Sequence, residues 1–547
     1  MIKLTPIGGI GEIGMNMFAF EAGGHVMFID CGVLFPPFQY LGVEAIVTDY
    51  EELCDKYKKI DAIFITHGHE DHVGGLPYLF QQNIPKVYAT PYAAEVIKFR
   101  VANVLGSKFK TNVSEMKYGT PVKEGPFNIE YIQVDHSIPD ASALFITIKG
   151  LRVLYVTDFR FSGKNKSAFL SRIQEIKKQG EIDLLLSDST NANDMDESVS
   201  EQAVLENLDG YFSKAKGRIV VTLFSSNISR VNQLITLCKK HGRSLFVAGH
   251  NLKTHISIAK KLGYLENDKG CIKPDSELSH TNKSKTVFLC TGSQAERNSS
   301  IMKLSNGIHP QLKIENGDLI IFSSSRIPGN EKLIMDAINR LAEKGAQIIY
   351  SDDVHCSGHA NIDELRALIK EVKPRYFLPI HGEFLHLKSH VDIAVSEGVP
   401  RENCFLPKNG DHLTYDGKEF SCVTSIERPG RLYVDSMTRE LIDNSILKER
   451  AICAERGLFS VVLVPNQKNS SKLFARPKIF TKGVSQSQVM KGLISGIEKK
   501  VAEFIRQNNK HKKLTDMKDD IKQLVKREVR RRYDDKPDVA VLIVEND

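Results

Sequence analysis

Residues 66–75 read Thr-His-Gly-His-Glu-Asp-His-Val-Gly-Gly, directly after an apolar run that is expected to form a strand. The stretch places His67, His69, Asp71 and His72 within six positions. Imidazole and carboxylate groups together suit zinc or manganese, and the lack of thiolates argues against a purely structural zinc site. On a loop between a strand and a helix, alternating ligands can point toward two adjacent ions. The stretch therefore predicts a metal centre.

Further candidate ligands stand at the ends of other expected strands. His136 follows the strand 131–134, Asp158 follows the run 153–156, and His381 lies in the sequence Leu-Pro-Ile-His-Gly-Glu after another strand. Each of these residues alone would be ambiguous. The recurrence of a polar residue at the end of a buried strand is typical of functional loops that a rigid sheet positions.

A glycine motif near the start suggests a different function, which the sequence argues against. Gly9, Gly11 and Gly14 fit the dinucleotide-binding pattern, with Asp30 further along the chain. That pattern must open a helix, because the helix N-terminus holds the pyrophosphate. Here residues 15–20 lead directly to Gly23-Gly24 and a second strand, so the segment is predicted to be a β-hairpin.

The chain reads as an α/β protein of several domains. Its 547 residues predict two to four folding units, and 41% hydrophobic and 26% charged residues exclude a mainly disordered chain. The first 190 residues read as short strands separated by glycine turns and then as strands alternating with helices, whereas residues 198–350 read as helices between buried strands. The expected strands are 17–20, 25–30, 61–66, 131–134, 144–148, 151–156, 182–186, 218–223, 346–350 and 539–544, and the expected helices include 202–212, 229–240 and 330–344.

Composition also indicates where in the cell the protein is expected to be. No apolar run approaches the roughly 20 residues needed to cross a bilayer, and no secretory signal is expected at the start. The nine cysteines are scattered and never form Cys-x-x-Cys, which indicates reduced thiols and a cytoplasmic protein.

The positive charge is concentrated near the end of the chain. Residues 498–536 hold 14 Lys and Arg against 8 Asp and Glu, whereas the net charge of the whole chain is only +7. This segment reads either as a solvated pair of amphipathic helices or as a surface for nucleic acid or an acidic partner. Composition does not choose between these interpretations.

The motifs as a set resemble one superfamily. The loop 67–75, His136, Asp158 and the glycines of residues 8–14 resemble the metallo-β-lactamase fold. Further segments resemble its β-CASP branch, which acts on nucleic acids, and within it the bacterial ribonuclease J family, from residue 1 to about 450. These segments read Ser-Asp-Ser-Thr-Asn (187–191), Cys-Ser-Gly-His-Ala (356–360), Pro-Ile-His-Gly-Glu (379–383), Thr-Gly-Ser-Gln (291–294) and Ser-Arg-Ile-Pro-Gly-Asn-Glu (325–331).

The resemblance implies an αββα metallo-β-lactamase domain interrupted by an inserted α/β β-CASP domain and followed by a small α+β C-terminal domain. The expected limits are 1–197 and 351–430 for the two parts of the lactamase domain, 198–350 for the insertion, 431–454 for a linker and 455–547 for a C-terminal assembly domain.

The resemblance also implies the ligands of two zinc ions, which manganese or magnesium could replace in vitro. The first ion is expected to be bound by His67, His69 and His136, the second by Asp71, His72 and His381, with Asp158 bridging the two. A pair of ions about 3.5–4 Å apart can activate a water and hold a scissile phosphodiester.

Other roles follow from the same resemblance. Asp71, Asp188 and His359 are the expected catalytic residues: Asp188 orients a ligating histidine, and His359 contacts phosphate and acts as general acid to the leaving 3′ oxygen. The expected substrate-binding residues are Ser226, Asn227, His355, Cys356, Ser357, Gly358, His359 and Ala360. Of these, Ser226, Asn227 and residues 357–359 are expected to form a pocket for a single terminal phosphate.

Three segments depart from the family pattern. Thr157 stands where a glycine usually precedes the aspartate, Gly249-His250 replaces the usual Gly-Arg, and residues 294–297 lack a common glycine. The second departure puts one substrate contact in doubt. None of the three removes an expected metal ligand.

The expected function is that of a zinc-dependent ribonuclease with 5′→3′ exonuclease and endonuclease activity, in mRNA decay and rRNA maturation. A small-molecule metallohydrolase of the thioesterase or lactamase type is the alternative enzyme, and a non-catalytic RNA-binding paralogue is the alternative outside catalysis. The expected partners are single-stranded RNA, a second copy in a homodimer or homotetramer, and other RNA-decay or ribosome-associated proteins, with no membrane.

Overall fold

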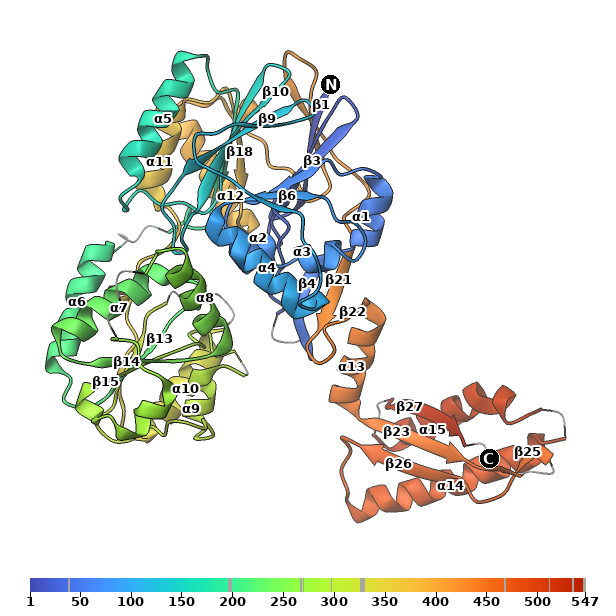
Figure 1. The fold of residues 1–547 in the computed structure, drawn as a ribbon. Helices are drawn as coiled ribbons and strands as arrows, with labels where there is room; N and C mark the ends of the chain where they lie inside the picture. Colours follow the sequence, from blue (N-terminus) through green and yellow to red (C-terminus); the bar gives the residue numbers. More distant parts are fainter. Residues whose placement is uncertain are drawn as a thin grey trace. The chain divides into compact units, whose positions relative to one another are not determined.

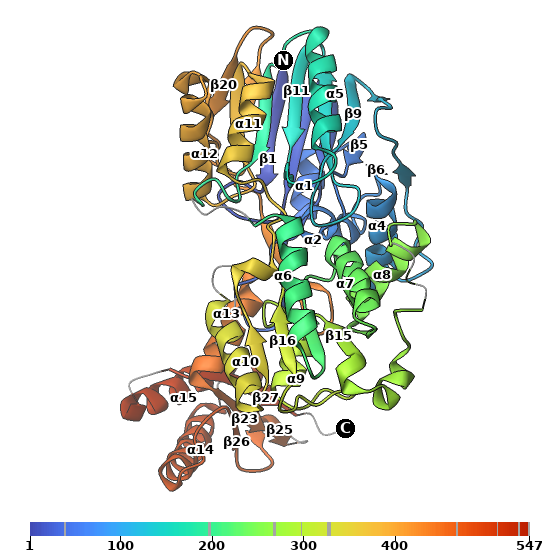
Figure 2. The ribbon, with the colours of Figure 1, turned by 90° about the vertical axis from the view of Figure 1, so that its left-hand side faces the viewer.

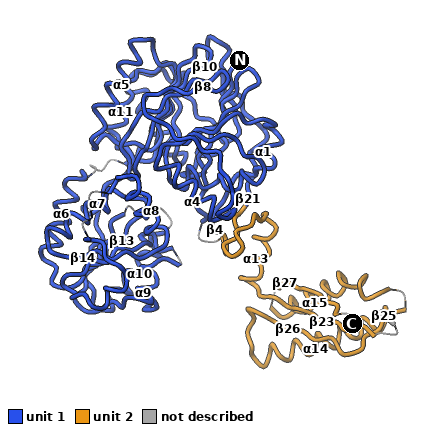
Figure 3. The backbone as a smooth tube through the Cα atoms, in the orientation of Figure 1, with its two compact units in different colours: residues 1–38, 44–432 blue, residues 39–43, 433–547 orange. Residues whose placement is uncertain are grey.

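The computed structural model describes residues 1–37, 40–194, 199–265, 268, 270–296, 298–324, 330–466, 469–510, 512–533 and 536–544, with only the backbone for 469–471. The chain forms two compact units (Figure 3). The first comprises Met1–Phe38 and Glu44–Leu432, and the second comprises Gln39–Val43 and Tyr433–Asp547.

Two β-sheets pack face to face at the centre of the first unit (Figure 1). The first sheet has the order β20-β19-β1-β2-β3-β5-β6-β7, and the second has the order β18-β12-β11-β10-β9-β8. The strands of the first are β1 (Ile2–Gly8), β2 (Met17–Ala22), β3 (His25–Ile29), β5 (Ala62–Phe64), β6 (Lys86–Ala89), β7 (Val113–Glu115), β19 (His412–Tyr415) and β20 (Phe420–Val423). Those of the second are β8 (Val122–Glu124), β9 (Phe127–Gln133), β10 (Ser142–Ile148), β11 (Leu151–Val156), β12 (Leu184–Asp188) and β18 (Tyr376–Ile380).

Apolar side chains from both sheets fill the space between them. Phe18 and Phe20 of β2 share one buried cluster with Tyr131, Leu144 and other residues of the second sheet. Alternate residues of each strand face this core, because side chains in a strand alternate between the two faces. The hairpin formed by β2 and β3 confirms the β-hairpin predicted to follow the glycine motif. Because strands follow the motif, no helix N-terminus is available there for a pyrophosphate.

Helices cover the outer faces of this sandwich. A second buried cluster joins α5 (Lys166–Lys178), α11 (Ile362–Val372) and α12 (Phe384–Ser396) to the second sheet. Other helices lie on the side of the first sheet: α1 (Tyr50–Lys56), α2 (Glu70–Val73), α3 (Leu76–Leu79) and α4 (Pro91–Leu105). The predicted αββα architecture is therefore confirmed.

A separate parallel sheet of order β14-β15-β13-β16-β17 lies between β12 and β18 in the sequence. Its strands are β13 (Ile219–Thr222), β14 (Ser244–Ala248), β15 (Thr286–Cys290), β16 (Leu319–Phe322) and β17 (Gln347–Ile349). The helices around it (Figure 2) are α6 (Glu201–Lys214), α7 (Ile228–Lys240), α8 (His250–Lys261), α9 (Ser300–Ser305) and α10 (Glu331–Glu343). This is the expected α/β insertion. Residues 198 and 325–329, which the sequence analysis also used, lie outside the described residues.

The second unit is a small α+β domain. Its sheet β26-β23-β27 packs with α14 (Gln488–Asn508) and α15 (Lys518–Tyr533) around one apolar core. The apolar faces predicted for the two helices are buried in that core, Ile497 and Val501 in one and Ile521 and Val525 in the other. The strands are β23 (Leu458–Leu463), β26 (Lys478–Lys482) and β27 (Asp538–Ile543), beside a short pair β24 (Pro465–Asn466) and β25 (Asn469–Leu473).

The segment expected to be a linker is folded. Residues 431–454 contain strand β21 (Arg431–Asp435), the short strand β22 (Leu441–Ile442) and most of helix α13 (Asn444–Arg456). Asp443 caps α13 through its carboxylate, and Arg450 forms an ion pair with Asp435. For this part of the chain the sequence predicted a strand at 539–544 and suggested a pair of amphipathic helices at 498–536, but it did not predict strands β23 and β26. All nine cysteines are free, and no helix of the described chain is long and apolar enough to cross a bilayer.

Candidate metal centre

The seven predicted ligands come together where four strands end. The loop after β5 carries four of them, and the other three follow β9, β11 and β18. Because β11, β12 and β18 are parallel neighbours, their carboxyl ends meet at one edge of the sheet. The sequence folds in this way because the strands are apolar and each polar residue comes directly after a strand.

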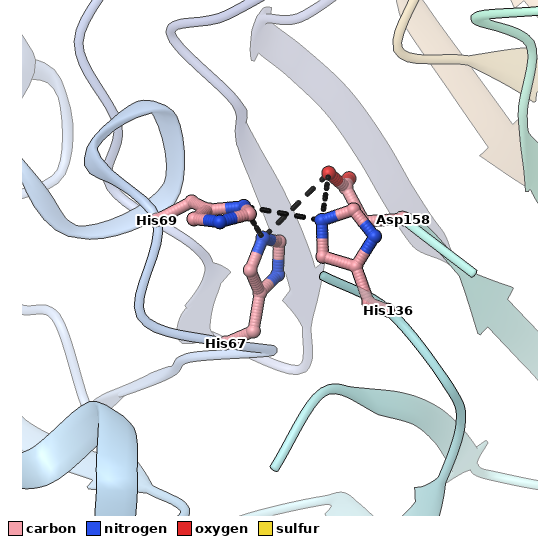
Figure 4. Close-up of side chains that lie close together, drawn as sticks. All are labelled: His67, His69, His136 and Asp158. Atoms are coloured by element: carbon pink, nitrogen blue, oxygen red, sulfur yellow. Dashed lines mark hydrogen bonds and ion pairs between the residues drawn. The ribbon is translucent and has the colours of Figure 1, made fainter. Parts of the chain in front are cut away.

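The first ligand group contains three histidines and one carboxylate: His67, His69, His136 and Asp158. Figure 4 shows their side chains pointing toward one another. His69 Nδ1 lies 3.1 Å from His67 Nε2 and 3.1 Å from His136 Nε2. Asp158 Oδ2 lies 3.6 Å from His67 Nε2 and 3.4 Å from His136 Nε2. Four donor atoms therefore converge on one small volume.

The second group contains two carboxylates and two histidines: Asp71, His72, Asp158 and His381. Asp71 Oδ2 lies 3.2 Å from His381 Nε2 and 3.5 Å from His72 Nε2. Asp158 Oδ1 lies 3.2 Å from His72 Nε2 and 3.6 Å from His381 Nε2. The two oxygens of Asp158 thus face different groups, the arrangement of a carboxylate shared between two sites.

Each histidine presents one ring nitrogen to the centre and binds the protein with the other. Four of the outer contacts are His67 Nδ1 to the Thr66 hydroxyl (3.1 Å), His69 Nε2 to the Ser226 hydroxyl (3.0 Å), His136 Nδ1 to the Gly358 carbonyl (2.6 Å) and His381 Nδ1 to the Thr190 hydroxyl (2.8 Å). Such outer contacts fix the tautomer and orientation of metal-ligating histidines. The N and O donor set, with no thiolate, fits zinc or a similar divalent ion.

The outer contact of the fifth histidine involves a residue that sequence reasoning missed. His72 Nδ1 donates to Asp30 Oδ2 over 2.8 Å, and both side chains are fully buried. Thr66 donates from its backbone and its hydroxyl to the same carboxylate. Asp30 was considered only as part of the glycine motif. It follows β3 directly, so the pattern that identified Asp158 could also have found it.

Backbone conformation marks the same residues. Asp30, Asp158 and His381 have φ values of 59°, 37° and 55°, in the left-handed region that non-glycine residues seldom occupy. Such strain persists only where the surrounding structure enforces it, and it concentrates at functional sites. Gly32 is required beside them, because a Cβ there would lie 1.6 Å from the carbonyl oxygen of Asp71.

Burial and neighbouring charges shift the pKa values of the histidines in opposite directions in the two ligand groups. Burial lowers the pKa of His67, His69 and His136, to about 4 for His69, so these rings are neutral and available as ligands. Burial also acts against charge on His72 and His381, but the neighbouring carboxylates, Asp158 foremost, outweigh it and raise both pKa values. The imidazoles in turn hold the pKa of Asp158 well below its ordinary value despite burial.

Asp188 and His359 lie beside the second group. Asp188 Oδ2 is 2.8 Å from His359 Nδ1, and Asp188 Oδ1 is 3.4 Å from His381 Nδ1. The other nitrogen of His359, Nε2, is 3.9 Å from Asp158 Oδ2. Asp188 thus contacts the rings of a predicted ligand and of the predicted general acid.

The predicted substrate-binding residues divide into two sets. Ser226 contacts His69, Gly358 contacts His136, and the Ser357 hydroxyl accepts the backbone N–H of His359 over 3.1 Å. His359 reaches Asp158 as described above, and within the described residues the other four members of the set have no contact with the centre. Asn227 caps α7, Cys356 contacts Arg160, Ala360 lies in the apolar core, and His355 is half-buried.

The departures from the family pattern leave the centre intact. The Thr157 hydroxyl donates to Asp158 Oδ1 over 2.7 Å and so supports the shared carboxylate. His250 begins α8, with its ring 5.6 Å from that of Phe99. Gln294 and Ala295 are buried, and Arg297 lies outside the described residues.

Comparison with known proteins supplies the family. The chain matches four family models: the ribonuclease J β-CASP domain at residues 216–341, the ribonuclease J C-terminal domain at 445–546, a β-lactamase superfamily domain at 37–216, and a Zn-dependent metallo-hydrolase RNA specificity domain at 351–407. A solved protein of unknown function from Enterococcus faecalis shares the fold, with a TM-score of 0.53 and 18% identity, over 75% of this chain and 99% of that one.

Named relatives match over most of their length. Ribonuclease J of Helicobacter pylori strain B128 is 33% identical over 93% of this chain and 74% of its own. Ribonuclease J2 of Bacillus subtilis is 29% identical over 90% of this chain and 89% of its own. Ribonuclease J of Mycoplasma genitalium is 29% identical over 94% of this chain and 92% of its own. With a His/Asp metal-binding cluster in place, the chain belongs to the ribonuclease J family and is a metal-dependent ribonuclease of the metallo-β-lactamase fold.

Proposed function

We propose that the chain degrades single-stranded RNA as a 5′→3′ exonuclease that prefers a 5′-monophosphate, and also cleaves RNA internally. The processes we propose are mRNA decay and rRNA maturation, in the cytoplasm. The observation that carries the chemistry is the Asp158 carboxylate, which offers one oxygen to each of two ligand groups. This arrangement supports two zinc ions per chain, held by the seven residues of those groups.

Bound there, divalent ions supply Lewis-acid activation of water and neutralise charge on the scissile phosphate. The chain's own residues arrange the rest of the reaction. Asp158 fixes the spacing of the two groups, and Asp71 completes the second. Asp188 holds His359 Nδ1, which leaves Nε2 directed at the centre. From this position His359 can donate a proton to the leaving 3′ oxygen.

The preference for a 5′-monophosphate rests on groups around this centre. Ser226 lies against His69 and the loop 357–359 lies against His136, so hydroxyl and imidazole donors surround the first ligand group. We propose that these groups form a pocket that accepts one phosphate and sterically rejects three. Asn227 is a weaker candidate, because its side-chain oxygen already accepts the backbone N–H of Arg230.

Two measurements on the full chain test the proposal. Metal analysis of the purified protein should give two ions per chain, with zinc as the main metal. Degradation of one RNA bearing either a 5′-monophosphate or a 5′-triphosphate should be faster for the monophosphate and should release mononucleotides from that end. A circularised form of the RNA, which has no 5′ end, isolates the endonuclease activity. One ion per chain, or equal rates for both ends, would contradict the proposal.

The alternatives have less support. A small-molecule hydrolase needs no inserted domain, and the RNA specificity domain matched at 351–407 argues against it. A non-catalytic paralogue would not need two complete ligand groups. We further propose that the protein acts as a homodimer or homotetramer paired through the domain at 455–547, and we retain the limits 1–197, 198–350 and 351–430 for the other domains. Contacts with other RNA-decay or ribosome-associated proteins are part of the same proposal.

A further inference from the structure

One buried carboxylate joins the insertion to the lactamase domain. Glu201 is the first residue of α6, at the start of the insertion. Its Oε1 accepts from Arg160 Nη1 over 2.8 Å, and its Oε2 accepts from Arg230 Nη2 over 3.2 Å and from the Gln233 amide over 2.9 Å. Arg160 follows β11 in the lactamase domain, whereas Arg230 lies on α7 of the insertion. A single carboxylate thus bridges guanidinium groups from two domains.

The two guanidinium groups of the cluster are buried, and the Glu201 carboxylate is mostly buried. The side chains of Arg160 and Arg230 are 5% and 0% exposed, and that of Glu201 is 19% exposed. Burying a charge is costly unless it is paired, so each arginine depends on the carboxylate. Burial raises the pKa of Glu201, but the guanidinium groups of Arg230 and Arg160 outweigh it, and the pKa lies below its ordinary value. The carboxylate is therefore charged at neutral pH.

Both arginines also hold the backbone that leads to His359. Arg160 Nη1 donates to the carbonyl of Ser357 over 3.2 Å, and Arg230 Nη1 donates to that of Val354 over 3.4 Å. The next carbonyl after Ser357, that of Gly358, accepts from the metal-centre residue His136. A Cβ at Gly358 would lie 2.7 Å from the His136 ring, so the loop has no room to shift toward the centre.

We propose that Glu201 is a positioning residue for cleavage: through Arg160 and Arg230 it holds residues 354–359 so that His359 faces the metal centre. This inference rests on the proposed role of His359. It makes the insertion part of the catalytic machinery, because Glu201 and Arg230 both belong to the insertion while His359 lies beyond it in the sequence. Asn191, which donates to the Ser357 hydroxyl and the His359 carbonyl, holds the loop independently and keeps it folded without Glu201.

The direct test compares Glu201→Gln with Asp209→Asn in the full chain. Both substitutions neutralise one carboxylate on α6, but among the described residues Asp209 pairs with Lys240 and His241, near the surface of the insertion. Glu201→Gln should lower kcat on RNA at least tenfold per metal-loaded chain, with KM within about threefold and metal content unchanged. Asp209→Asn should leave all three unchanged. A kcat for Glu201→Gln within twofold of the parent value would overturn the proposal.

A second variant addresses folding. Glu201→Gln leaves two buried guanidinium groups without a counter-charge, so the chain can lose stability. The double variant Glu201→Gln/Arg230→Met removes one charge of each sign and preserves the buried balance. It should fold with the parent's metal content and still show the loss in kcat. A folded double variant with the parent's kcat would mean that the cluster serves only stability.

An RNA-like oligonucleotide with sulfur as the bridging 3′ atom separates this inference from the proposed function. A thiolate leaves without a general acid, so His359→Ala should lose far less rate on the sulfur linkage than on the oxygen linkage. Glu201→Gln should show the same rescue. Rescue of His359→Ala without rescue of Glu201→Gln would overturn the positioning role of Glu201. Failure to rescue His359→Ala would overturn the role of His359 as the acid. In that case the kcat values of Glu201→Gln and Asp209→Asn would decide whether Glu201 contributes to cleavage.

Discussion

Asp188 and His359 are joined by a short contact, 2.8 Å from Oδ2 to Nδ1, between the last residue of strand β12 and a loop residue that lies 171 positions later in the sequence. The other oxygen of Asp188 accepts from the Thr190 hydroxyl, which contacts the ligand His381. One carboxylate therefore holds both a predicted metal ligand and the predicted acid. This link connects the segments 187–191, 356–360 and 379–383, which are far apart in the chain, into one unit.

Replacing His359 with alanine should lower turnover by roughly 10²-fold or more, the usual contribution of a positioned acid or base, with metal content nearly unchanged. The measurement is kcat on a 5′-monophosphorylated RNA together with metal analysis of the same sample. Asp188, His359 and His381 also form a possible ligand group of their own. Loss of an ion from the variant would therefore mean that His359 is a ligand and not the acid.

The variant Asp188→Asn should reduce turnover and also weaken metal binding, because the carboxylate contacts the rings of both His359 and His381. Loss of such an outer contact typically costs 10–100-fold in affinity or activity. Titration with zinc and kcat at saturating metal separate the two effects. If excess zinc restored full turnover, Asp188 would support metal binding through His381 and would not be needed to position His359.

Replacing His72 with alanine should abolish nuclease activity and leave the fold intact. The ring provides Nε2 to the second ligand group, 3.2 Å from Asp158 Oδ1, and no apolar core includes it. Circular dichroism and metal analysis would accompany the assay. The half-exposed His25, which forms an ion pair with Asp61 at 3.3 Å, provides a matched control when replaced by alanine. Normal turnover of His72→Ala would contradict the two-ion assignment.

Asp30 gives a prediction that the sequence did not provide. Asp30→Ala should weaken binding at the second ligand group by about 10–100-fold, because His72 loses the acceptor that orients its ring. Asp30→Asn retains an oxygen acceptor for His72 and should lose less metal affinity. Activity of both variants should recover with added metal. An Asp30→Ala variant that binds metal like the parent would show that the remaining contacts of His72 suffice to orient it.

The strands and the ligands could be predicted from sequence because their signals are local. Alternating or continuous apolar residues define β2, β10 and β11, and the spacing of residues 67–72 is itself a metal motif. Asp30 follows a strand as Asp158 does, but it was missed because it belongs to none of the segments that carry the family resemblance and was assigned to the glycine motif instead. Glu201 was missed for a different reason: acidic residues are common in the first turn of a helix, and its arginine partners lie 41 and 29 residues away.

In the second unit the missed elements had weak signals. Strand β26, Lys478–Lys482, has a single buried residue, Ile479, between lysines, so it reads as part of a charged segment. Its antiparallel pairing with β23 stabilises the strand, which its own sequence pattern does not predict. Tertiary packing decides the conformation of such short segments more than their own composition does.

Deleting residues 457–547 should weaken dimerisation and processivity while the metal ions stay bound. The apolar core of the second unit consists of residues between Phe459 and Val539, so the deletion removes that core whole and leaves the cores of the lactamase and inserted domains untouched. All seven predicted ligands also lie before residue 382. Light scattering at several protein concentrations, with metal analysis in parallel, gives the oligomeric state and the occupancy. An unchanged dimer would mean that the subunit interface lies in the remaining domains. The basic segment at 498–536 would then be the surface for RNA or an acidic partner, and the salt dependence of RNA binding should differ between the full and shortened chains.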